Sequence, residues 1–328
     1  MAEDKLNKTE FRWFLGVVED RNDPLGLKRC RVRIFGKHSE NVNLIPTNSL
    51  PWAYDSRTNG MTDSKKEGDW CFGFFMDGEQ EQQPVIIGII DGITESLGRV
   101  GAGFCDNRTE EQIQNSPTKQ RNPKFPNEPS TSRLYRGISE GTVIETIKNN
   151  MIDGQPEPSF SPQQPYNNVY ESETGHAIEL DDTPNHERVQ ISHKNGSYIE
   201  LRNDGDVVEK IVKDNYTIVA GNEQVIIKGN CDIKVDGNVN INVSGNCNLN
   251  TGGNVNAGVG GSINATVGGS VTAKVGGTLS VSSGGGSCDV SFGNINMKGN
   301  IMLDGDVIVS GKSVMKGHTT LYGVTVIE

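Results

Sequence analysis

Apolar and polar positions alternate along the last third of the chain. From Val219 to Ile327 the odd positions hold mostly Val, Ile, Ala, Leu, Cys or Gly. The even positions between Lys228 and Cys288 are almost all Asn, Lys, Asp, Ser, Thr or Gly. Side chains of a β-strand point to opposite faces with a period of two. The alternation therefore predicts a long β-structured region with one apolar face and one polar face.

Glycine replaces an apolar residue once in every repeat, first every eight residues and then every six. Both steps are even, so the same face stays apolar throughout, and glycine permits the chain to bend where a longer side chain would not. We interpret these glycines as the corners of the repeat: Gly221, Gly229, Gly237, Gly245, Gly253, Gly261, Gly269, Gly277, Gly285, Gly293, Gly299, Gly305, Gly311, Gly317 and Gly323.

A single copy of this repeat would expose its apolar face and a row of unpaired strand edges, so we expect three chains to wind around one another. The expected structure is an intertwined triangular β-helix, or needle, with octapeptide repeats over 219–293 and a narrower hexapeptide tip over 294–328. Its interior residues are small or β-branched: Val239, Ile241, Val243, Val255, Ala257, Val259, Ile263, Ala265, Val267, Val271, Ala273 and Val275. Cys231 and Cys247 fall on the same inward face, whereas Cys288 falls on the outward face.

Two other repeat architectures are less consistent with this pattern. A single-chain β-solenoid usually has longer coils and larger inward side chains. A calcium-binding array needs a period of nine and a regular aspartate, whereas this repeat has a period of eight with Asn, Ser or Thr after the glycine.

The N-terminal region has a different pattern. Runs of β-branched and aromatic residues at 11–19, 30–35, 69–76 and 84–90 are separated by turn residues. Short strands in under a hundred residues predict a small closed barrel of the OB type over 1–105. Arg29, Arg31 and Arg33 alternate with apolar residues, which is typical of the solvated face of a barrel strand.

The middle of the chain is rich in proline, since residues 106–165 hold eight of the 13 prolines. We predict a Pro-rich linker there, with a short ordered segment only at 142–151, and a β-rich junction into the needle at 166–218. Glu110, Glu111, Glu140 and Glu145 are expected to be solvated linker charges, because sixty such residues cannot form a catalytic cleft with a core of its own.

Composition excludes several classes of function. The net charge of −11 divides into −3, −7 and −1 for residues 1–105, 106–218 and 219–328, so no region is basic enough for a nucleic-acid footprint. The six cysteines form no CxxC pair and no zinc-spaced cluster with histidine, which favours reduced thiols in a protein assembled in a cytoplasm. No apolar run reaches the 18 or so residues of a membrane span, and no cofactor or metal is expected.

Two segments of the sequence resemble a known family. Trp13–Leu25, with 31–36 and 45–52, resembles the N-terminal OB domain of the central spike proteins, or tail-associated lysozymes, of T-even-type contractile phages. The stretches 173–184 and 193–200 resemble the start of the trimeric β-helix in those spikes and in the VgrG spikes of type VI secretion systems. The repeat is similar to their triangular needle.

The resemblance implies a structural protein of the virion. Its barrel would dock on a trimeric baseplate hub, its needle would puncture the host outer membrane when the sheath contracts, and a PAAR-type protein is an expected partner at the needle tip. The family carries a lysozyme domain between barrel and needle, where this chain has only the predicted linker, so we expect no enzyme activity. Some related spikes bind iron at the apex through an HxH motif, whereas His318 stands alone here, so we expect no iron.

Two alternatives remain open at this point. One is a type VI-like spike that delivers an effector, although such a spike would carry a hub-like region before the barrel. The other is a β-helix enzyme that degrades polysaccharide, which would need a cluster of carboxylates along one face. The acidic residues of the repeat are scattered instead: Asp232, Asp236, Asp289, Asp304 and Asp306.

Overall fold

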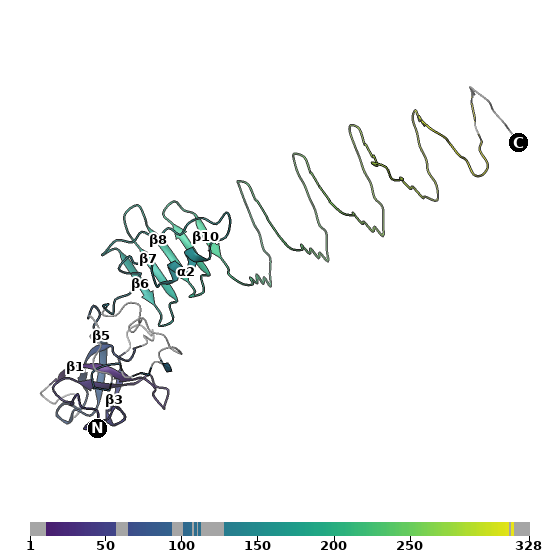
Figure 1. Ribbon diagram of the computed structural model, residues 1–328. Helices are drawn as coiled ribbons and strands as arrows, with labels where there is room; N and C mark the ends of the chain where they lie inside the picture. The colour runs from purple at the N-terminus through teal and green to yellow at the C-terminus, as the bar shows by residue number, and fades with distance from the viewer. Residues whose placement is uncertain are drawn as a thin grey trace. The chain divides into compact units, whose positions relative to one another are not determined.

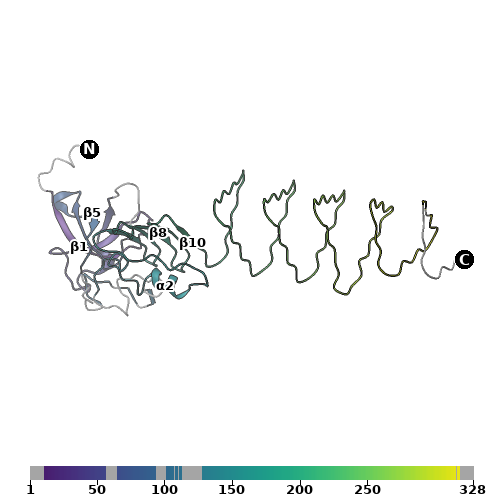
Figure 2. The same cartoon turned by 90° about the horizontal axis from the view of Figure 1, so that it is seen from above.

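The computed structural model describes residues 11–56, 65–93, 101–106, 108–109, 111–112, 128–314 and 316–317. The described chain is mostly β-structured or extended, with very little helix, and it divides into two units at residues 228 and 229 (Figures 1 and 2). Gly323 and His318 lie outside the described residues, so their predicted roles stay predictions.

Five strands close into a barrel in the first unit. They are β1 (Trp13–Asp20), β2 (Cys30–Ile34), β3 (Trp52–Asp55), β4 (Trp70–Phe75) and β5 (Pro84–Ile89), in the order β1-β2-β3-β5-β4. All neighbours are antiparallel except β3 and β5. The four strands expected from the apolar runs are confirmed, and β3 completes the closure.

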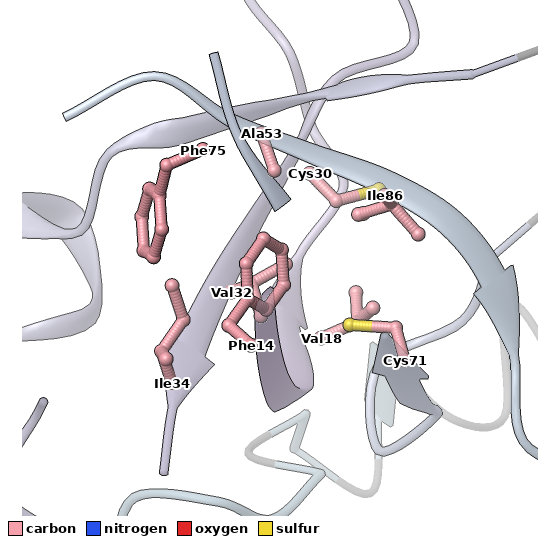
Figure 3. Close-up of a cluster of buried hydrophobic side chains, with 9 residues drawn as sticks. All are labelled: Phe14, Val18, Cys30, Val32, Ile34, Ala53, Cys71, Phe75 and Ile86. Atoms are coloured by element: carbon pink, nitrogen blue, oxygen red, sulfur yellow. The ribbon is translucent and has the colours of Figure 1, made fainter. Parts of the chain in front are cut away.

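The barrel interior is filled by the inward side chains of all five strands (Figure 3): Phe14, Val18, Cys30, Val32, Ile34, Ala53, Cys71, Phe75 and Ile86. The two cysteines are free thiols. Burial raises the pKa of Cys30 to about 12 and raises that of Cys71 as well, so both are protonated and unreactive at neutral pH.

Arg33 corrects the sequence-based view of β2. Its side chain is fully buried and pairs with the equally buried Glu19, with 2.6 Å between Nε and Oε1. It also donates to the backbone oxygens of Ser39 and Ile45. The alternation along β2 shows which residues share a face but not whether that face is exposed. At Arg33 the face is covered by the loop that follows the strand.

A second sheet contains five antiparallel strands in sequence order: β6 (Asn167–Glu171), β7 (Ala177–Asp181), β8 (Arg188–Ser192), β9 (Tyr198–Arg202) and β10 (Val207–Lys210). Short turns join them, with glycine at positive φ at Gly175, Gly196 and Gly205. The sheet occupies the stretch expected to be a β-rich junction.

Residues 128–165 of the region predicted to be a linker pack against this sheet. The helix α2 (Val143–Asn149) confirms the expected ordered segment, and Thr142 caps it by accepting the N–H of Ile144. Val143, Ile144 and Ile147 pack with Leu134 against Ala177 and Tyr198 of the sheet. This part of the chain is therefore a cover on the sheet, and its few apolar residues share the core of the sheet.

The repeat region has a bend at every described corner glycine. Between the bends the chain runs back and forth in extended stretches (Figures 1 and 2). The described residues after Lys210 form no strand pairing within the chain, and all of them are exposed. The octapeptide corners from Gly221 to Gly277 are two-residue bends such as 244–245 and 276–277, whereas the described hexapeptide corners are single residues.

The two kinds of corner use glycine differently. Gly299, Gly305, Gly311 and Gly317 have φ between +114° and +146°, whereas the octapeptide corners from Gly221 to Gly277 lie outside this region. A side chain at positive φ clashes with its own backbone. Hexapeptide corners thus require glycine for its backbone conformation.

We therefore predict different costs for alanine at the two kinds of corner. Gly305→Ala should destabilise each chain by roughly 1–2 kcal/mol through the strained φ alone. Gly261→Ala, the matched control, adds the same methyl group at a corner without positive φ and should cost less. Thermal unfolding of the two full-length variants measures the difference, and equal shifts would contradict this explanation.

Candidate assembly surfaces

The sheet β6–β10 leaves an apolar face uncovered in the single chain. Side chains that share this face are between 38% and 63% exposed: Tyr170, Ile178, Leu180, Val189, Ile191, Ile199, Leu201 and Val207. The strand register places Ile178, Ile191 and Ile199 in one cross-strand row, and Leu180, Val189, Leu201 and Val207 in the next. A contiguous apolar patch of this kind marks a surface that another molecule covers.

The opposite face of the same sheet is polar and buried. Arg188 is completely buried, with Nη2 2.9 Å from Glu179 Oε1 and Nη1 3.6 Å from Glu200 Oε2. Phe160 lies over its guanidinium group, 5.0 Å from the ring centroid. Burial raises the pKa of Glu179, while the charge of Arg188 opposes that shift. The charged face is therefore inside the fold and the apolar face outside it.

Residues 128–165 seal this polar face with hydrogen bonds. Asn167 donates to the carbonyl oxygen of Leu134 at 3.1 Å, and the Ser159 N–H donates to Glu200. Lys210 donates to the carbonyl oxygen of Asn150. Because buried charges are costly unless they are paired, the cover and the sheet form one interdependent structure.

The second candidate surface is the predicted needle interior. The twelve interior positions, from Val239 to Val275, are all exposed in the single chain, as are Cys231 and Cys247. The repeat follows directly after β10, so the apolar face of the sheet and the apolar stripe of the repeat are consecutive along the sequence. Neither has a covering element in the described part of the chain.

The third candidate surface is a strip of aromatic residues on the outside of the barrel. Phe11 and Trp13 are each 61% exposed. The ring of Phe11 stacks on Phe74 at 4.7 Å and meets Trp13 edge-on at 5.0 Å. Trp13 and Phe74 are cross-strand partners of β1 and β4, and Leu15 continues the strip. Rigid, exposed rings of this kind are typical of protein interfaces.

Ion pairs link the barrel to the first turn of the sheet. Arg21 donates to both carboxylate oxygens of Glu173, at 2.7 and 2.8 Å, and its Nε lies 3.2 Å from Glu67. Arg108 lies 3.4 Å from the same Glu173 and 2.7 Å from Asp106. A bidentate, half-buried arginine pair holds a fixed geometry.

No group of three or more His, Cys, Asp and Glu side chains in the described ranges could hold a metal ion. The rings of His176 and His193 approach to 4.4 Å, a contact that their sequence spacing did not predict. Glu140 is mostly exposed beside Arg133, whereas Glu145 accepts the N–H of Gly141 near the start of α2. No helix among these residues is long and apolar enough to cross a bilayer.

Sequence reasoning found the alternation but not which face of the sheet is covered. The pattern over 177–202 sets apolar Ile and Leu against Glu, Gln and Arg, which conventionally places the apolar set inside. One feature could have indicated the reverse. The polar set contains both signs of charge at adjacent cross-strand positions, so it can neutralise itself when buried.

Comparison with known proteins identifies relatives in phage baseplates. Protein Gp5 of the Vibrio phage KVP40 is 31% identical over 271 residues, which cover 66% of this chain and 61% of that protein. The pre-baseplate central spike protein Gp5 of Enterobacteria phage T4 is 34% identical over 116 residues, or 31% of this chain and 20% of that protein. The chain thus matches about three fifths of the first relative and one fifth of the second. No family model matches the chain.

Proposed function

The chain is a homologue of the Gp5 proteins of T4-like phages, and on this relationship we propose that it is the central spike of a contractile tail baseplate. In this role it is a structural component of the virion. Its needle punctures the host outer membrane when the sheath contracts.

The observation that carries the proposal is the uncovered apolar face of the sheet and its continuation in the repeat. Burial of apolar surface stabilises by about 25 cal/mol per Å², and nothing in the described part of one chain covers these residues. Three copies whose sheets face a common axis would bury Ile178, Ile191 and Ile199 against their symmetry mates. The same axis would run through the repeat, where the small interior residues allow three chains to approach closely.

The proposed architecture has an OB-fold barrel, the covered sheet, and a trimeric triangular β-helix. The order of the barrel strands and the parallel pair β3–β5 support the OB assignment. Winding three chains together pairs the strand edges that a single chain leaves open. Such a needle unfolds only when all three chains separate, so it should be kinetically stable.

The trimer is tested by running the full-length protein unboiled and boiled on an SDS gel. We expect a three-chain band without boiling and a one-chain band after it. Ile191→Asp places a charge in the apolar face and should lower the temperature at which the three-chain band is lost, because the carboxylate would be buried without a partner.

Asn168→Asp is the matched control, since it adds the same carboxylate at the edge strand of the same face. A one-chain band in both lanes for the unmodified protein would contradict the trimer. Equal effects of the two substitutions would contradict the sheet face as its interface.

The barrel is proposed to dock on a trimeric hub protein through the aromatic strip of Phe11, Trp13, Leu15 and Phe74. The strip lies outside the closed barrel, so removing a ring leaves the barrel core intact. Exposed tryptophan at an interface commonly contributes a large share of the binding energy.

Trp13→Ser should weaken capture of the co-expressed hub protein of the same phage by about tenfold or more. Tyr54→Ser removes another exposed ring, from β3, and should leave capture unchanged. Capture by Trp13→Ser at the level of the unmodified protein would place the hub contact elsewhere on the barrel.

We also propose that the chain is not a peptidoglycan hydrolase. The segment between barrel and sheet is short, and its residues 128–165 are used as the cover of the sheet. A general acid with a raised pKa in a cleft is the minimum for muramidase chemistry. Burial raises the pKa of one carboxyl group, Glu179, but this group is sealed beside Arg188.

The purified trimer should therefore give no clearing of a peptidoglycan layer, under conditions in which a known lysozyme clears it. Clearing by the unmodified protein would show that a hydrolytic site exists. In that case Glu179→Gln should leave the clearing unchanged if the buried pair is purely structural.

A further inference from the structure

Within the octapeptide region, the repeat between Gly285 and Gly293 reverses the apolar alternation. Leu279 and Val281 before this repeat occupy odd positions, as do Ile295 and Met297 after it. Within this repeat the apolar residues are Cys288, Val290 and Phe292, at even positions. Simple counting would therefore turn these three side chains to the outside of the needle. Phe292 is the one aromatic residue between Tyr216 and Tyr322 in the sequence.

The backbone has an irregular corner immediately before these residues. Other octapeptide corners are two-residue bends, but this one has three, 284–286, all glycine. Gly285 has φ of +144°, the first positive φ in the repeat, and the N–H of Gly286 donates to Ser283 Oγ at 3.0 Å. The next corner, at Gly293, is a single-residue bend without positive φ.

The corner at 284–286 is thus one residue longer than the corners before it, and the corner at Gly293 is one residue shorter than those corners. An extra residue at a bend advances the following strand by one position and exchanges its two faces, as a β-bulge does. Counted from Gly286, the residues Cys288, Val290 and Phe292 stand at the second, fourth and sixth positions. Ile263, Ala265 and Val267 stand at the same positions after Gly261.

We propose that this corner restores the inward face, so that Cys288, Val290 and Phe292 line the needle interior against the same residues of two further copies of the chain. The inference rests on the proposed trimer. It corrects the outward placement of Cys288 that follows from counting alone. Three Phe292 rings then meet around the axis and close the interior with an aromatic layer, at the point where octapeptide repeats give way to hexapeptide repeats.

The aromatic layer gives the irregular corner a physical purpose. Each phenylalanine side chain buries far more surface than the valine or alanine of other layers, so three rings need a wider cross-section than their neighbours. An added glycine at the corner lengthens the path of the chain around that layer without adding a side chain. Gly293 then removes the extra residue, and the hexapeptide repeats continue with Ile295 and Met297 facing inward.

The reactivity of individual thiols in the native full-length protein tests the proposal. A maleimide is added to the folded protein, and the labelled peptides are measured by mass spectrometry after denaturation. Cys288 should react about tenfold or more slowly than an outward thiol, because a buried thiol reacts only when the structure opens locally. Two variants provide outward thiols, Ser280→Cys in the preceding repeat and Ser291→Cys beside Phe292.

The proposal and simple odd–even counting predict opposite labelling rates for Cys288 and for the thiol of Ser291→Cys. The proposal expects Cys288 to be as protected as Cys231 and Cys247, and Ser291→Cys to react as fast as Ser280→Cys. A trimeric sample in which Cys288 reacts as fast as Ser280→Cys would overturn it. If the protein instead sediments as a monomer and Cys231, Cys247 and Cys288 all react rapidly, the proposed trimer itself fails.

Two substitutions that introduce a charge provide a second measurement, which does not depend on the maleimide reaching the thiols. Phe292→Asp should lower the temperature at which the SDS-resistant trimer dissociates, whereas Ser291→Asp should leave it nearly unchanged. The opposite order of the two variants would place Phe292 on the outer face.

Discussion

The structure depends on one constraint: the apolar positions of the second half of the chain lie on a face that no described residue of the same chain covers. In the sheet this face carries rows of isoleucine and leucine, such as Ile191 and Leu201, and in the repeat it carries valine, isoleucine and alanine. An isolated repeat lacks the contacts that could offset its loss of conformational entropy. In the proposed trimer, association supplies the free energy that orders the repeat, which couples folding to assembly.

The sheet shows how a single chain can be stable and still leave this face open. Its polar face is closed by residues 128–165, in which α2 supplies apolar contacts. Within that face, Arg188 pairs with Glu179 and Arg202 pairs with Glu200. Removing one partner of such a buried group would leave an unpaired charge, so the cover and the sheet are stable only together. The charged residues are thereby paired within the chain, and the apolar residues remain exposed for the contacts that we propose between chains.

Much of this organisation could be predicted from the sequence, because a period of two and turn residues are local properties. Four barrel strands, the short helix after Thr142 and the even steps of the repeat follow from them. Which face of a strand is buried is not local. Arg33 is buried by the loop that follows its strand, and Glu179 is buried beneath residues 128–165, and strand alternation is the same in either case. The three glycines at 284–286 are visible in the sequence. Whether they turn the following residues to the other face, as we propose, depends on the backbone conformation of Gly285.

A needle of identical repeats has a problem of register that these irregular elements solve. Slipping one chain of the proposed trimer by eight residues would leave every face correctly apolar, so the repeat alone distinguishes such a slip poorly. The sheet β6–β10 is not repetitive, and because it precedes the repeat in the sequence it would align the three chains of the proposed trimer at their first turn. The layer of Phe292 marks the far end of the octapeptide region, since a slipped chain would set its ring against a corner glycine or a smaller side chain. Features that depart from the repeat at its two ends therefore specify the alignment that the repeat itself leaves open.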